Sequence, residues 1–531
     1  MTENKRQFRA IKGTRDILPP DSALWNWLEQ TARNTFESYN FREIRLPILE
    51  EAQLFARSVG EDTDIVGKEM YRFSGKLDSL RRAICESIGR LDNSSRIYTF
   101  VQFLAVLRRN LHEGLDGGQI SKNLSNLHRI GQLEARCMEG ERRLLNGDVE
   151  PSAAWNELFE ETISILQEFR PIEKSEETLR PEGTASVCRA YIENGMQNLP
   201  GDVKLYYVGP MFRRERPQKG RYRQFYQIGA ELLGQSDAPA IDAEVIEMLM
   251  TFFKRAGLTR TTLYINSIGD KNCRPQYVEL LREELRKVAD HPPEGGRLGP
   301  DSLRRIETNP LRVLDSKLPE EHPIIAKLPR ISDHLCDACR EHFAKLKEEL
   351  SLRGIAYEEN WRLVRGLDYY TRTTFEVIAE GLGSQNAVCG GGRYDGLVEL
   401  LGGPPTKGIG FAIGTDRAIL SIQESGKLPQ LPALAVFVAW MGQAAYPTAV
   451  NITRKLRDAG LAVELPAEEM KFKKSLGLAD KLGARYALII GEDEVNSGTF
   501  TLKHLADSDQ KKLSEFDLLE YLESERRDTR A

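Results

Sequence analysis

Residues 206–234 read YYVGPMFRRERPQKGRYRQFYQIGAELLG. The β-branched and aromatic residues at both ends predict two strands, and Pro217 and Gly220 predict the turn between them. Six cations lie near that turn: Arg213, Arg214, Arg216, Lys219, Arg221 and Arg223. Because a planar guanidinium binds phosphate through paired hydrogen bonds, this hairpin predicts a site for a polyanion. A solvated, charged hairpin tip is the alternative that the hairpin alone leaves open.

The second strand of this hairpin predicts a polar pocket beside the cations. Side chains alternate between the two faces of a strand. One face therefore carries Gln227, Gly229 and Glu231, and the other carries Tyr226, Ile228 and Ala230.

Composition sets the limits for the rest of the chain. A chain of 531 residues is too long for one core, and about three or four domains are expected. The net charge is −5, so any basic surface is local. The amino terminus lacks an apolar signal core, which predicts a cytoplasmic protein. Seven scattered cysteines indicate reduced thiols rather than a disulfide framework.

Two further segments place polar residues beside strand-like or helix-like runs. In LRPEGTASVCRA, residues 179–190, Glu182 and Thr184 precede a predicted helix. They could receive a substrate ammonium or simply cap that helix. In VRGLDYYTRTTFEVIAE, residues 364–380, Arg365 precedes a strand beside Tyr369 and Tyr370. It could stabilise negative charge developing on a substrate, or form a structural ion pair.

Glycines cluster in GGGRYDGL, residues 390–397, and in GIGFAIGTDRAI, residues 408–419. Gly408, Gly410, Ala412 and Gly414 would form one smooth face of a strand, on which a flat ligand could lie. Arg417 follows in the next helix, within reach of a phosphate or a ring. Neither a GxGxxG turn opening a Rossmann helix nor a GxxxxGK[ST] loop occurs, so the site predicted here lies on an antiparallel sheet.

Taken in order, PEGT, FRRERPQKGRYRQF, RGLDYYTRTTFE, GGGRYDGL and GIGFAIGTDR resemble the motifs of histidyl-tRNA synthetases, a family of class II aminoacyl-tRNA synthetases. The resemblance extends over residues 8–74 and 178–520, including KGTRDILP, FREIRLPILE and KSLGLADKLGARYALIIGEDE. It implies an α+β fold: a catalytic antiparallel sheet flanked by helices, followed by a carboxy-terminal α/β anticodon-binding domain. It also implies histidine activation by ATP and transfer to tRNA(His), with release of AMP and pyrophosphate.

The resemblance also assigns roles to the residues that match. Arg213 and Arg365 would act on the ATP α-phosphate and the histidine carboxylate. Glu215 and Arg221 would position the nucleotide and its Mg²⁺-bound phosphates, and Arg417 would lie on the γ-phosphate and adenine side. No protein metal ligand is expected, since Mg²⁺ would be held mainly through ATP. Histidine would be bound by Glu182, Thr184, Gln227, Glu231, Arg365, Tyr369, Tyr370 and Tyr394.

We expect residues 1–75 and 178–424 to form the catalytic domain, with a small helical insertion near 300–355, and residues 432–531 to form the anticodon-binding domain. An amphipathic helix is expected near residues 22–39. In the family, the strand corresponding to the one that contains Pro47 would form the interface of a homodimer. No membrane contact is expected.

Within the helical insertion, HLCDACREH superficially suggests a zinc knuckle formed by His334, Cys336, Cys339 and His342. A continuous helix with Cys339 on its apolar stripe is favoured instead, because one helix rarely supplies four tetrahedral ligands.

Residues 76–177 depart from the family pattern, in which a short turn is expected. Their helix-like stretches predict a small inserted bundle. Its basic first part could touch tRNA or another partner, although a solvated appendage is favoured. Two other functions compete with charging: a histidine-sensing regulatory subunit and a stress-sensing pseudo-synthetase domain.

Overall fold

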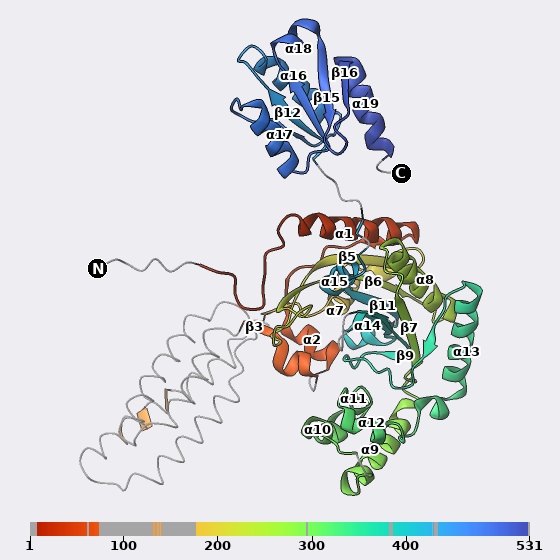
Figure 1. Ribbon diagram of the computed structural model, residues 1–531. Coiled ribbons are helices and arrows are strands. Elements are labelled where there is room, and N and C mark those ends of the chain that lie inside the picture. Colours follow the sequence, from red (N-terminus) through yellow and green to blue (C-terminus); the bar gives the residue numbers. More distant parts are fainter. Residues whose placement is uncertain are drawn as a thin grey trace. The chain divides into compact units, whose positions relative to one another are not determined.

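The computed structural model describes most of the chain outside the predicted insert. The described residues form two compact units, one drawn from Met1–Ile17 and Leu28–Leu428 and the other from Leu18–Trp27 and Pro429–Ala531 (Figure 1). Within the described part, no helix has the length and apolar character needed to cross a membrane. The described residues are 8–60, 63–73, 131, 132, 135, 136, 139, 177–293, 296–381, 386–426, 428–429 and 434–528.

A mixed sheet of eight strands forms the centre of the first unit. Its order is β1-β5-β6-β11-β10-β9-β7-β8, and all neighbours are antiparallel except the two outermost pairs, which are parallel. The predicted antiparallel sheet is therefore confirmed in its six central strands. The strands are β1 Arg42–Glu43, β5 Val203–Phe212, β6 Gln224–Gly234, β7 Thr261–Ser267, β8 Glu358–Glu359, β9 Thr371–Ala379, β10 Ala387–Arg393 and β11 Lys407–Gly414.

The arginine-rich hairpin is confirmed as β5, a loop and β6. Gly220 has a φ of +72°, a left-handed conformation that glycine adopts without strain. Gln218 and Arg221 exchange backbone hydrogen bonds of 3.0 and 2.9 Å across the tip. At its base, the Arg223 amide donates to the Gly13 carbonyl at 2.7 Å. The amino-terminal KGTRDILP segment therefore supports the hairpin.

One face of the sheet carries the aromatic core. In α1 Asp21–Ser38, close to the predicted residues 22–39, Phe36 packs against Tyr206 of β5 and Phe411 of β11, with ring centroids 5.6 and 5.7 Å apart. Phe252 of α8 Pro239–Arg255 joins them at 5.8 Å. Because side chains alternate along each strand, Glu231 and Gly410 lie on the opposite face. That face is left for the polar pocket.

A small second sheet has the order β2-β4-β3, with β2 Leu49–Glu51, β3 Tyr71–Phe73 and β4 Glu177–Leu179. The predicted strand containing Pro47 is not found, because Pro47 lies between β1 and β2. Proline has no N–H to donate to a strand ladder, which explains the interruption. In this sheet Phe73 of β3 pairs with Glu177 of β4. The two ends of the segment between them are therefore close together. The predicted bundle over residues 76–177 lies outside the described residues, except for its last residue and five scattered ones.

Helices between β7 and β8 begin at Arg274, upstream of the expected start near residue 300. Figure 1 shows α9 to α12 gathered in one group, with α13 leading back toward the strands. HLCDACREH is not one continuous helix: a 3₁₀ turn covers Ile331–His334, and α13 begins only at Asp337. The helices are α9 Arg274–Asp290, α10 Pro300–Thr308, α11 Leu311–Leu314, α12 His322–Ile325 and α13 Asp337–Leu352.

Four further α-helices lie in the described part of the first unit. The last of them ends at Glu424 and so covers the first four residues of SIQESGKLPQLP, the polar segment 421–432 between the two units. The helices are α2 Ala52–Val59, α7 Thr184–Glu193, α14 Leu397–Leu400 and α15 Thr415–Glu424.

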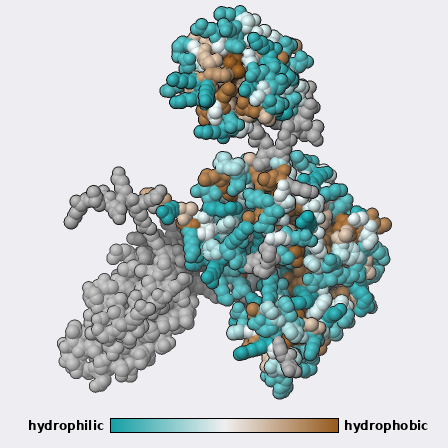
Figure 2. All heavy atoms as spheres, in the orientation of Figure 1, coloured by the Kyte–Doolittle hydropathy of each residue, from teal (hydrophilic) through white to brown (hydrophobic). Residues whose placement is uncertain are grey.

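The second unit is a five-stranded sheet of order β13-β12-β14-β15-β16, covered by helices. The apolar runs VFVAW and YALII form β12 Val436–Trp440 and β14 Tyr486–Ile490, both fully buried. Figure 2 shows that hydrophilic residues dominate the visible faces of both units, with apolar residues in smaller patches. The remaining elements are β13 Val463–Glu464, β15 Thr499–His504, β16 Gln510–Ser514, α16 Tyr446–Asp458, α17 Phe472–Lys481, α18 Glu492–Ser497 and α19 Glu515–Asp528.

Candidate active site

A cavity of about 260 Å³ opens on the polar face of the central sheet. Its walls come from the hairpin loop, β6, β9, β10, β11 and the starts of α7 and α15, segments that are far apart in the sequence. Of the residues predicted for the site, those that line this cavity are Glu182, Thr184, Arg213, Glu215, Arg221, Gln227, Arg365, Tyr369, Tyr370 and Arg417.

Three arginines crowd one part of the cavity. Arg417 donates to the carbonyl of Ala387 at 2.8 Å and to that of Gly220 at 3.4 Å. Burial lowers the pKa of the Arg417 guanidinium, and the charges of Arg221 and Arg213 lower it further. Burial and the charge of Arg213 likewise lower the pKa of Arg221. Because like charges repel when desolvated, a polyanion in this part of the cavity would relieve an existing strain.

Arg365 lines the same cavity and is partly buried, with 20% of its side chain exposed. Its Nη1 donates to Glu376 Oε2 at 2.7 Å, so the ion pair considered from sequence is present. Its buried Nε has no partner within the described structure, however. A buried donor without a partner costs about 1 to 3 kcal/mol. A substrate oxygen at this position would satisfy it.

Glu182 caps helix α7, so the helix-cap interpretation is correct for this side chain. Its carboxylate oxygens accept from the amides of Thr184 and Ala185 at 2.6 and 2.9 Å. Since each oxygen has a second lone pair, Glu182 can still accept from a ligand in the cavity. Burial raises its pKa above the ordinary value.

Glu231 and Tyr394 lie beneath the cavity rather than in its wall. The Thr184 hydroxyl donates to Glu231 Oε1 at 2.7 Å, and the Tyr394 hydroxyl donates to Oε2 at 2.7 Å. Burial raises the pKa of Glu231 to about 8, and the charge of Glu182 adds to the rise. A cationic group held nearby would favour its ionised form.

The smooth glycine face of β11 is only partly open, which corrects the prediction for Gly408 to Gly414. A Cβ at Gly408 would lie 2.2 Å from the Tyr394 ring, and one at Gly410 would lie 1.7 Å from Glu231 Oε2. Those two glycines therefore make room for side chains of the protein. Only Ala412 and Gly414 reach the cavity.

Sequence reasoning missed two carboxylates of the cavity wall and a buried tyrosine outside it. Glu376 and Asp416 line the cavity, and Asp416 accepts from Arg15 at 2.9 Å and from the Tyr226 amide at 3.1 Å. Tyr207 is buried, and its hydroxyl has no hydrogen-bond partner among the described residues. Glu376 belongs to a run of polar residues at alternate positions of β9, and this alternation could have identified it from the sequence. Nothing local distinguishes Tyr207.

A second cavity of about 190 Å³ shares Arg213, Glu215 and Arg221 with the first. Its other walls include three arginines of the helices between β7 and β8, which are Arg304, Arg305 and Arg312. The positively charged surface around the hairpin therefore extends beyond the first cavity. Such a surface suits a ligand with several phosphates.

Family models identify the mixed sheet with its arginine-lined pocket as a class II aminoacyl-tRNA synthetase core, and the second unit as an anticodon-binding domain. Residues 168–425 match the family model of the tRNA synthetase class II core domain (G, H, P, S and T). Residues 435–525 match that of the anticodon binding domain.

Curated relatives specify the family further. Histidine–tRNA ligase of Koribacter versatilis (strain Ellin345) is 44% identical over 520 residues, covering 97% of this chain and 96% of that protein. The same enzyme of Solibacter usitatus (strain Ellin6076) is 44% identical over 508 residues, with coverages of 96% and 97%. The chain belongs to the histidine–tRNA ligase family. Since these alignments span nearly the whole chain, the segment between β3 and β4 has counterparts in both relatives. The expectation that residues 76–177 depart from the family pattern is therefore wrong for these two members.

Solved structures agree with this assignment. Apo histidyl-tRNA synthetase of S. aureus superposes with a TM-score of 0.65 at 30% identity, covering 97% of this chain and all of that one. An ATP phosphoribosyltransferase regulatory subunit/histidyl-tRNA synthetase of Bacillus halodurans has a TM-score of 0.53 at 17% identity, which shows the fold alone.

Proposed function

We propose that this chain activates L-histidine with ATP and transfers it to tRNA in the cavity on the polar sheet face. The observation that carries the proposal is the convergence of Arg213, Arg221, Arg365 and Arg417 on one cavity that also contains Glu182 and Thr184. Cations for phosphates and acceptors for an amine therefore meet in the same space.

In the first step, a carboxylate oxygen of histidine attacks the α-phosphorus of ATP. A new O–P bond forms, and the bond to the leaving pyrophosphate breaks. Negative charge develops on the α-phosphate oxygens, where Arg213 and Arg365 would stabilise it from two sides. Catalysis then consists of orientation and charge stabilisation, and no protein nucleophile is needed.

The ATP-binding residues would be Arg213, Glu215, Arg221 and Arg417. Two of the lining carboxylates are paired already: Glu215 with Arg221, and Glu376 with Arg365. Their remaining lone pairs fit a role as occasional oxygen ligands of Mg²⁺, with most ligands coming from phosphates and water. When bound, Mg²⁺ neutralises charge on the β- and γ-phosphates.

Histidine would be held by Glu182, Thr184, Gln227, Glu231, Arg365, Tyr369, Tyr370 and Tyr394. Support comes from Gln227 Oε1, a buried acceptor with no partner within the described structure. An imidazole N–H is a donor of suitable size. A ligand without that N–H would leave the acceptor unpaired, at a cost of about 1 to 3 kcal/mol.

In the second step, a hydroxyl of the terminal tRNA ribose attacks the adenylate carbonyl and AMP leaves. The loop 213–223 would meet the acceptor end, and residues 432–531 would bind the anticodon of tRNA(His). We further propose a homodimer in the cytoplasm, with residues 1–75 and 178–424 as the catalytic domain. Exposed Ile48 and Leu49, at 44% and 51%, are apolar candidates for the interface.

A histidine-sensing regulatory subunit is the second candidate, because a protein described as an ATP phosphoribosyltransferase regulatory subunit/histidyl-tRNA synthetase shares the fold. Charging of tRNA(His) by the purified protein, together with histidine-dependent ATP–pyrophosphate exchange, distinguishes the two. We expect both activities. Histidine binding by a folded protein without either activity would favour the regulatory function and contradict ours.

A further inference from the structure

Three cysteines and one aspartate meet at a place that the active site does not use. Asp270 and Cys273 lie in the loop between β7 and α9, and Cys336 and Cys339 lie at the start of α13. One potential ligand atom from each residue lies within 4.8 Å of all the others. The cysteines are free thiols. The sequence interpretation of HLCDACREH considered Cys336 and Cys339 only with His334 and His342.

Neither histidine belongs to this cluster. His342 Nε2 lies 3.1 Å from the Asp237 carbonyl oxygen, and the ring of His334 stacks near Tyr277 with centroids 5.8 Å apart. The break in the helix before Asp337 is what turns Cys336 toward the other loop. The four-residue set therefore combines two x₂-spaced pairs, Asp270/Cys273 and Cys336/Cys339, as zinc sites commonly do.

The distances fit a tetrahedral ion. Asp270 Oδ1 lies 3.7 Å from the sulfur of Cys273 and 3.9 Å from that of Cys336. With metal–sulfur bonds of about 2.3 Å, ligand atoms at the corners of a tetrahedron are about 3.8 Å apart. The remaining ligand atoms lie within 4.8 Å of one another, so they would have to approach by at most about 1 Å to hold an ion at the centre.

Two helix amino termini and a backbone amide lie next to the cysteine sulfurs. Cys273 and Cys336 are the residues that precede α9 and α13, so two positive helix ends converge on the sulfurs. The Asp270 amide also lies 3.4 Å from the Cys273 sulfur. Gly269 has a φ of +67°, and a Cβ there would lie 2.8 Å from that sulfur. The absence of a side chain at Gly269 therefore leaves room for the Cys273 thiol.

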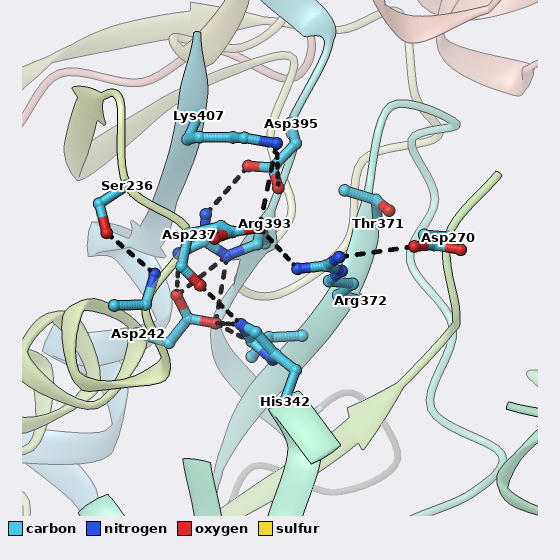
Figure 3. A network of polar contacts seen from close by, with 12 residues as sticks. Ser236, Asp237, Asp242, Asp270, His342, Thr371, Arg372, Arg393, Asp395 and Lys407 are labelled. Atoms are coloured by element: carbon cyan, nitrogen blue, oxygen red, sulfur yellow. Dashed lines mark hydrogen bonds and ion pairs between the residues drawn. The ribbon is translucent and has the colours of Figure 1, made fainter. Parts of the chain in front are cut away.

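Arg372 completes the shell on the outer side. Figure 3 shows it between Asp237 and Asp270, and its guanidinium lies 2.8 and 3.6 Å from their carboxylates. It leaves Asp270 Oδ1 to face the sulfurs. A neighbouring cation offsets the excess negative charge of three thiolates and a carboxylate around a divalent ion.

We propose that Asp270, Cys273, Cys336 and Cys339 bind one zinc ion as a structural site with all four positions filled by protein. Thiolate ligands select zinc over magnesium or calcium, and a closed tetrahedral set is typical of a structural ion. On binding, each of the three thiols releases its proton to solvent. The ion would join the β7–α9 loop to α13.

The zinc site would also stabilise one wall of the active-site cavity. The Arg372 amide donates to the Gly269 carbonyl at 2.8 Å, and Arg274 donates to the Tyr370 carbonyl. Tyr370 lines the cavity. Loss of the ion would therefore loosen the segment carrying Tyr369 and Tyr370 and would lower the thermal unfolding temperature.

The test is metal analysis of the full-length protein, purified with a reductant from zinc-supplemented cells and dialysed. We expect about one zinc per chain. The apo protein given Co²⁺ should show thiolate-to-metal charge-transfer bands and the intense visible bands of tetrahedral cobalt. Zinc-free protein that stays folded, shows no such bands and does not gain thermal stability with zinc would overturn the proposal. A disulfide among these cysteines in the reduced preparation would do the same.

Variants identify the ligands. Cys336→Ser/Cys339→Ser should retain less than about one tenth of the wild-type zinc. Cys188→Ser removes a buried thiol outside the cluster and should keep the zinc. If the double variant does not fold, Asp270→Cys decides: a fourth thiolate should intensify the cobalt charge-transfer bands, and unchanged bands would contradict ligation by residue 270.

Discussion

The Thr184 hydroxyl donates a 2.7 Å hydrogen bond to Glu231, joining the first residue of α7 to the middle of β6 beneath the active-site cavity. Glu231 is 1% exposed and accepts a second bond from Tyr394. Two hydroxyl donors do not offset the loss of water around this carboxyl group, since its pKa is raised from 4.5 to about 8. The polar floor of the site is therefore sensitive to pH.

Glu231→Gln should remove a pH-dependent cost of folding. The unfolded carboxyl ionises near pH 4.5 and the folded one near pH 8, so wild-type stability falls as pH rises through this interval and levels off above it. The full effect is on the order of 5 kcal/mol. Urea unfolding at pH 5 and pH 8 should show the variant gaining relative to wild type at the higher pH.

The control for that measurement is Glu283→Gln, an exposed residue of α9, which should track wild type at both pH values. A stability difference between Glu231→Gln and wild type that is the same at pH 5 and pH 8 would show that Glu231 has an ordinary pKa.

Arg365→Ala should lower kcat for histidine-dependent pyrophosphate exchange by about 10²- to 10³-fold, the usual effect of removing a donor to a developing oxyanion. Arg365→Lys keeps the charge but loses the planar pair with Glu376, so an intermediate loss is expected. Arg286→Ala, on the exposed face of α9, is the matched control. An unchanged kcat in Arg365→Ala would exclude transition-state stabilisation by this residue.

Gly390→Ala should inactivate the enzyme without altering any charge. A Cβ at Gly390 would lie 1.9 Å from Arg365 Nη2, so the guanidinium must leave its place against β10. We expect kcat for pyrophosphate exchange to fall nearly as far as in Arg365→Ala. Gly477→Ala in α17 meets no neighbour and should stabilise that helix by up to about 1 kcal/mol. Full activity of Gly390→Ala would mean that Arg365 acts from another position.

Local sequence patterns were sufficient to predict the strands and the hairpin that carry the site residues. Alternation placed Gln227 and Glu231 on the polar face of β6, and the cations around Gly220 were correctly put at a hairpin end. The family resemblance indicated which distant segments would meet in one cavity. The functional roles of these residues stay predictions until the variants are measured.

Contacts between distant segments explain what sequence reasoning missed. Nothing near Gly408 or Gly410 reveals that Tyr394 and Glu231 occupy the space above them. The cysteine cluster was missed for two reasons. The pair Asp270/Cys273 contains only one cysteine, and Cys336 and Cys339 were assigned to a continuous helix. The strand predicted at Pro47 was wrong because proline has no N–H to donate to a strand ladder.

Asp242 and Arg393 form a buried ion pair on which several elements converge (Figure 3). Their side chains are 0% and 1% exposed, and Thr373 also donates to Asp242 at 2.6 Å. Asp242→Ala leaves the buried Arg393 guanidinium without its main partner and should lower the free energy of unfolding by about 3 to 5 kcal/mol. Adding Arg393→Met should recover part of that loss in denaturant unfolding. A double variant less stable than Asp242→Ala would show that Arg393 is adequately paired by Asp395 alone.

Replacing residues 76–176 by a short turn should preserve both the fold and histidine activation. Phe73 and Glu177 are paired on neighbouring antiparallel strands, so a tight turn can rejoin β3 and β4 without moving Glu182 or Thr184. We expect kcat and KM for histidine in pyrophosphate exchange within about 10-fold of wild type. The same protein tested for tRNA charging separates the two interpretations of the segment: retained charging indicates an appendage, and lost charging with intact exchange indicates a contact with tRNA. Complete loss of exchange in a folded deletion variant would show that the segment supports the histidine pocket itself.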